Sequence, residues 1–154
     1  MTISFELSQS VTRLSDQHKA LSKSVAALAE TIARRSCDTA PVLALLREIQ
    51  EAAARHFADE ERFMESLNYP WLPTHRMNHR WFARFVADYI DGVASGIIAI
   101  NDDARRNLPT LLKFHLTARD DDFETWLEAA RGGTFWFPWA RAALSPAHPT
   151  TSAG

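Results

Sequence analysis

The sequence predicts an all-α protein folded as an up-down-up-down antiparallel four-helix bundle. Hydrophobic residues recur at steps of three and four, 46% of the 154 residues are hydrophobic, and only 5 are glycine. These features are typical of helices that each bury one face in a shared core. We expect one bundle domain over residues 8–133 and a separate tail over residues 134–154.

Each of the first three helices is predicted from its own buried face. The first face runs from Val11 to Ile32, the second from Val42 to Leu67 and the third from Leu72 to Val93. Pro41 suits the first turn of the second helix, and the Asn-Tyr-Pro segment after Leu67 ends that helix.

The fourth helix is expected from Leu108 to Ala130 and to end before Gly132. Asn107 and Pro109 form either a cap with a first turn or a kink. Residues 97–107 are either a short helix or the beginning of the fourth helix.

Charge and composition exclude several classes of protein. The formal net charge is −2 and no segment is strongly basic, which argues against nucleic-acid binding. No apolar run approaches the ~18 residues that a membrane span needs. The single Cys37 cannot form an internal disulfide, and the first residues lack an export signal, so we expect a cytoplasmic protein.

Metal-ligating side chains lie on or beside the inward faces of all four predicted helices. His56 with Glu60, and His75 with His79, are four residues apart and so share a helix face. One buried histidine is more often a hydrogen-bonded core residue than a ligand, but a whole set is costly to bury unless it holds metal. The set comprises His18, His56, Glu60, His75, His79, His115 and Asp120.

Spacing alone does not decide which carboxylate of the fourth helix is the metal ligand. Asp120 follows His115 by five residues, a rotation of about 140°. Asp122 lies nearly in line with His115 but two turns away. Helix geometry favours Asp120 by a small margin.

The types of donor atom limit which metals the site could hold. Imidazole and carboxylate without thiolate suit Fe, Zn, Mn or Cu. A zinc protease is a poor fit, because Arg76 replaces the catalytic glutamate of the HExxH motif. If both carboxylates and one oxo or hydroxo group bridge two octahedral ions, one position stays vacant, on the ion with fewer histidines. A small ligand such as O2 could bind there.

The sequence resembles the hemerythrin family over about residues 11–127, through HFADEERFMESLNYPWLPTHRMNHRWF, DQHKAL and LLKFHLTARDDDF. The resemblance implies two iron ions joined by an oxo or hydroxo bridge. One iron would be held by His75, His79 and His115, the other by His18 and His56, with Glu60 and Asp120 bridging. It implies reversible O2 binding, for storage, delivery or sensing, at the iron held by His18 and His56. The alternative is a peroxidase or nitric-oxide-consuming enzyme on the same scaffold.

Two groups of apolar residues complete the expectations. By helix phase, the O2 pocket is expected to be lined by Leu21, Phe57, Phe82 and Leu111, the last standing where many bacterial family members have tryptophan. The tail is expected to cover one end of the bundle or to contact an oligomer or another partner through Phe135, Trp136, Phe137 and Trp139. Its last residues, SPAHPTTSAG, are expected to be disordered.

Overall fold

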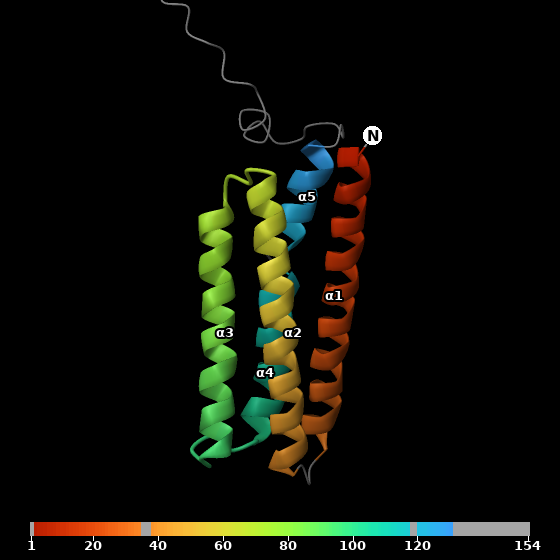
Figure 1. Cartoon of the computed structure of the whole chain (residues 1–154). Coiled ribbons are helices and arrows are strands. Elements are labelled where there is room, and N and C mark those ends of the chain that lie inside the picture. The colour runs from red at the N-terminus through yellow and green to blue at the C-terminus, as the bar shows by residue number, and fades with distance from the viewer. Residues whose placement is uncertain (1, 35–37, 118–119, 131–154) are drawn as a thin grey trace, which may run out of the picture. The chain divides into compact units, whose positions relative to one another are not determined.

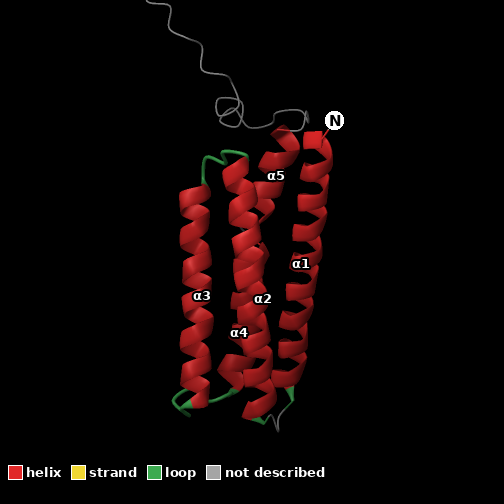
Figure 2. Ribbon diagram, in the orientation of Figure 1, coloured by secondary structure: helices red, strands yellow, loops and turns green. Residues whose placement is uncertain are grey.

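The computed structural model describes residues 2–34, 38–117 and 120–130, which contain helices and the turns between them but no strand (Figures 1 and 2). The helices are α1 (Thr2–Ala33), α2 (Thr39–Ser66), α3 (Leu72–Ala94), α4 (Asp102–Thr117) and α5 (Asp120–Ala130). The all-α prediction is therefore confirmed. The chain divides into two compact units, residues 1–117 with α1–α4 and residues 118–154 with α5.

In the first unit, α1, α2 and α3 lie side by side and share one core (Figure 1). α2 packs against both α1 and α3, whereas α4 packs mainly against α1 and less extensively against α3. The predicted faces supply this core, because residues three and four apart share one side of a helix. Its buried members are Leu21, Val25, Leu28, Ile32, Val42, Leu46, Ile49, Ala53, Phe57, Phe82, Val86, Ile90, Leu108 and Leu112.

A residue in the left-handed backbone conformation follows the end of α2 and of α3. Asn68 has φ 53°, and the amides of Asn68 and Tyr69 donate to the carbonyls of Glu65 and Met64 at 3.1 and 3.0 Å. Gly96 has φ 74° and plays the same part after α3. Asparagine and glycine tolerate this conformation best, and α2 ends where the sequence predicted a break.

The fourth helix begins earlier than its expected cap. Asn101 accepts a hydrogen bond from the amide of Ala104 at 2.9 Å, and α4 starts at Asp102. Pro109 lies inside the helix, so the interpretation of Asn107 as the cap is wrong. The Asn101 cap and the burial of Leu108 and Leu112 offset the backbone hydrogen bond that Pro109 cannot make.

The expected fourth helix corresponds to α4 and α5, on either side of residues 118–119. In α5, Phe123 and Trp126 are buried, and their rings stack with centroids 6.1 Å apart. The predicted aromatic tail lies outside the described residues. Among the helices of the described part of the chain, none has the length and apolar character needed to cross a membrane.

Candidate metal centre

The carboxylate of Glu60 is the centre of a buried cluster between α2 and α3. Only 3% of Glu60 is exposed. The Nε2 of His75 donates to its Oε2 at 3.0 Å. The Nε2 of His79 lies 3.2 Å from the same oxygen, close enough for an ion pair but not aligned as a hydrogen bond. Two nitrogens therefore converge on one carboxylate oxygen.

The spacing of these donors fits a metal ion. One donor atom from each of Glu60, His75 and His79 can be chosen so that all lie within 4.8 Å of one another. Metal bonds of about 2.1 Å at right angles would place neighbouring donors about 3.0 Å apart. The observed separations of 3.0 and 3.2 Å match that value. The cluster could hold a metal with small side-chain movements.

The histidines also control the charge of Glu60. Burial would by itself raise the pKa of this carboxyl group. The contacts from His75 and His79 outweigh burial and lower the pKa of Glu60 from 4.5 to about 2. The charge of His56, one turn away on α2, acts in the same direction. Glu60 is thus held ready as an anionic ligand.

This lowered pKa predicts acid sensitivity of the metal-free protein. A carboxyl group whose pKa is lower in the folded state stabilises the fold above its unfolded pKa and loses that effect as the pH falls through its folded pKa. For Glu60 the window runs from about pH 4.5 down to about pH 2, with a loss of up to about 3 kcal/mol. Urea unfolding of wild type and Glu60→Gln across this window measures the loss. Equal pH dependence in both proteins would contradict the assignment.

His56 and His18 form a second group beside the first. His56 is 2% exposed and His18 is half-buried. Their rings meet edge to face, with centroids 5.8 Å apart. Because His56 precedes Glu60 by four residues on α2, the second group lies one helical turn from the first. The structure thus brings five of the seven candidate ligands into one region.

The side chains of the remaining two candidate ligands lie outside the described residues. His115 lies in α4, and its side chain is outside the described residues. Asp120 is the first residue of α5, in the second unit, and its side chain is likewise outside them. The competing Asp122 has an exposed side chain.

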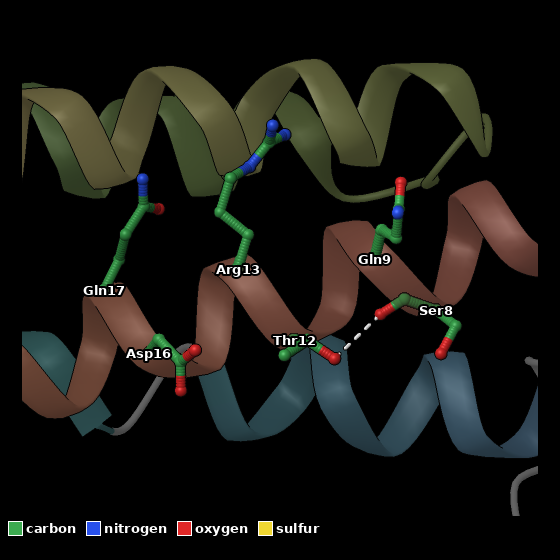
Figure 3. Close-up of a pocket in the computed structure, with 6 residues that line it drawn as sticks. All are labelled: Ser8, Gln9, Thr12, Arg13, Asp16 and Gln17. Atoms are coloured by element: carbon green, nitrogen blue, oxygen red, sulfur yellow. Dashed lines mark hydrogen bonds between the residues drawn. The ribbon is translucent and has the colours of Figure 1, made fainter.

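Polar contacts fix α1 against α2 beside the site. Gln17 donates from Nε2 to Oδ2 of Asp59 at 2.8 Å, and Arg13 lies 3.6 Å from the same oxygen. Figure 3 shows Arg13 and Gln17 pointing from α1 toward α2, at the edge of a shallow pocket of about 470 Å³. Since Gln17 precedes His18 and Asp59 precedes Glu60, these contacts set the height of His18 relative to the cluster.

A second carboxylate contacts the cluster from outside. The Nδ1 of His79 donates to Oε1 of Glu61 at 2.8 Å, while Nε of Arg76 donates to Oε2 at 3.2 Å. Sequence reasoning missed Glu61 and assigned Arg76 no role in the site. The paired acids of HFADEE and the arginine inside HRMNH were the available signals.

Apolar side chains enclose the histidines. Phe57 stacks on His79 with ring centroids 3.8 Å apart and meets Phe82 edge to face at 5.4 Å. Both phenylalanines and Leu21 belong to the core. The placement of Leu111 in this wall is wrong, because its side chain is 39% exposed.

Leu111 instead lines a surface pocket of about 450 Å³ with Tyr89 and Ile97. The inward residue of α4 is Leu112, which is fully buried. Adjacent residues of a helix point about 100° apart, so both leucines cannot face the core equally.

Comparisons with known proteins match most of this chain. A family model described as the hemerythrin HHE cation binding domain matches residues 9–127. A bacteriohemerythrin from Stenotrophomonas maltophilia (strain R551-3) is 30% identical over 98 residues. The matched stretch covers 64% of this chain and 63% of that relative, slightly less than two thirds of each. No solved structure gives a significant match.

Proposed function

Since the chain belongs to the hemerythrin family, we propose that it holds two iron ions and binds O2 reversibly. The observation that carries this proposal is the buried cluster of Glu60, His75 and His79, with donors at the separations that neighbouring metal ligands adopt. The name of the bacterial relative supports it further.

The ligands divide unequally between the two irons. In this proposal one iron is held by three histidines and the other by two, with two carboxylates and an oxo or hydroxo group bridging them. This division would leave a coordination position open at the iron with two histidines, where O2 would bind. The first iron takes His75, His79 and His115, the second takes His18 and His56, and the bridges are Glu60 and Asp120.

The up-down-up-down arrangement is part of the proposal, and contacts between neighbouring helices support it. As residue numbers rise along α1, the numbers of their partners in α2 fall, because Gln17 bonds Asp59 whereas Ser24 bonds Glu48. Such pairing is expected of antiparallel neighbours with short connections.

The irons would supply the electrons for reversible O2 binding, and the protein would keep water and protons away. Phe57, Phe82 and Leu21 provide the apolar wall for this purpose. Among the described residues, the buried histidines and acids are His56, Glu60, His75 and His79, all of them proposed ligands. The buried Tyr69 adds a hydroxyl group, and its ring centroid lies 6.5 Å from that of His75. The apolar character of this wall favours a carrier over a peroxidase.

A spectroscopic cycle tests this function. The ferrous protein, prepared without air, should contain about two irons per chain, should change its absorption spectrum when O2 is added and should return to the first spectrum under argon. The ferric protein should consume hydrogen peroxide only slowly. Protein that takes up one zinc and no iron would contradict the two-iron site. Rapid peroxide turnover without a reversible change of spectrum would favour the enzyme.

The single cysteine supports our expectation of a cytoplasmic location.

A further inference from the structure

His79 is restrained on three sides of its ring. Phe57 covers one face, with the two rings only 9° from parallel. Nε2 lies 3.2 Å from an oxygen of Glu60, and Nδ1 donates to Glu61. These contacts leave the ring little freedom to rotate, so the direction of each nitrogen is fixed by its neighbours.

The carboxylate of Glu61 is itself aligned by a cation from α3. Oε1 accepts from His79, and Oε2 accepts from Nε of Arg76 at 3.2 Å. A second nitrogen of Arg76 lies 3.3 Å from Glu65, one turn further along α2. Arg76 thus links two acids of α2 and directs one oxygen of Glu61 at the histidine. The side chain of Glu61 is 25% exposed, so this contact lies at the border of the core.

A neutral imidazole carries its proton on one nitrogen only. Donation of Nδ1–H to a carboxylate leaves the lone pair on Nε2, the atom that faces Glu60. Such a carboxylate also makes the imidazole a better donor to metal. We propose that Glu61, held by Arg76, is a positioning residue that keeps Nε2 of His79 directed at the metal. This inference rests on the proposed function, since it takes His79 as a ligand.

Zinc binding to the metal-free protein tests this role without O2. Glu61→Leu removes the acceptor and should weaken zinc affinity about 10–100-fold, the usual effect of losing such a partner. Glu61→Gln keeps an oxygen that can accept from Nδ1–H and should stay within about threefold of wild type. The matched control is Glu65→Leu, which removes the other acid at Arg76 but makes no contact with His79, and it should bind zinc like wild type.

Nuclear magnetic resonance gives a second measurement. In the zinc-loaded wild type, the His79 ring should carry its proton on Nδ1, and this proton signal should be retained in Glu61→Gln. Thermal unfolding of the metal-free variants separates a general loss of stability from a loss of positioning. If Glu61→Leu does not fold, Arg76→Met serves instead and should weaken zinc affinity by a smaller factor.

Equal zinc affinity of Glu61→Leu and Glu65→Leu would overturn the role of Glu61, as would a His79 ring protonated on Nε2 in the zinc form. Either result would leave the two-iron proposal intact if wild type still binds metal normally. Wild-type protein that binds neither zinc nor iron would remove both proposals.

Discussion

Replacing Glu60 by alanine is expected to empty the metal centre. Glu60 is the shared partner of His75 and His79, and in the proposed site it bridges both irons. Its removal should lower iron affinity by more than the roughly 100-fold that loss of a mere supporting residue can cost. The metal-free protein should also lose about 1–3 kcal/mol, because the buried His75 loses its acceptor. Iron counted per chain and urea unfolding measure the two effects.

Glu51→Ala is the matched control for this change. Glu51 lies on the same helix, but its side chain is 74% exposed and only approaches Arg55. We expect iron content like that of wild type and a stability change within about 0.5 kcal/mol. Normal iron content in Glu60→Ala would mean that the cluster is a structural ion pair and not a metal centre.

The largest expected loss of stability comes from Phe82→Ala. Phe82 is 1% exposed, and its ring packs against Phe57, which in turn stacks on His79. Truncation of a buried phenylalanine leaves a cavity and typically costs about 3–5 kcal/mol. Urea unfolding of the metal-free protein measures this cost without any contribution from iron.

Phe85→Ala provides the comparison on the same helix. Phe85 is only half-buried and stacks on the exposed Trp81, with ring centroids 5.2 Å apart. Because part of its surface is already in water, we expect a smaller loss than for Phe82→Ala. Equal losses in the two variants would show that the core does not centre on Phe82.

The helices were largely predictable because one physical rule governs them. A helix that buries one face repeats its apolar residues at three and four, so Leu21, Val25 and Leu28 identified the inward side of α1 directly. The same rule placed His56 and Glu60 inside, and both are buried. Burial by helix phase requires no knowledge of the neighbouring helices.

The start of α4 could not be predicted in this way. Asn101 and Asn107 are both reasonable caps, and Pro109 is favourable in a first turn but unfavourable in a helix interior. The choice depends on how α4 packs, since burial of Leu108 and Leu112 stabilises the longer helix. Local sequence does not contain that packing energy. The prediction that Leu111 lines the O2 pocket was wrong for the same reason.

Contacts between side chains of different helices could not be predicted from the sequence either. Asp59 and Glu61 flank Glu60 and look like ordinary surface acids, yet Asp59 binds Gln17 of α1 and Glu61 binds His79 of α3. Which partner each acid finds depends on the rotation and relative height of the helices. Those quantities are fixed by packing across the whole core.

The hydrogen bond between His75 and Glu60 bears on how pH would govern metal loading. The Nε2 of His75 donates its proton to Oε2 of Glu60, and both atoms belong to proposed metal ligands. Ligand atoms must be deprotonated before they bind a metal, so protons and metal ions compete for the same positions. Iron loading would therefore displace the proton of this hydrogen bond, and the affinity of the site for metal should fall as the pH is lowered.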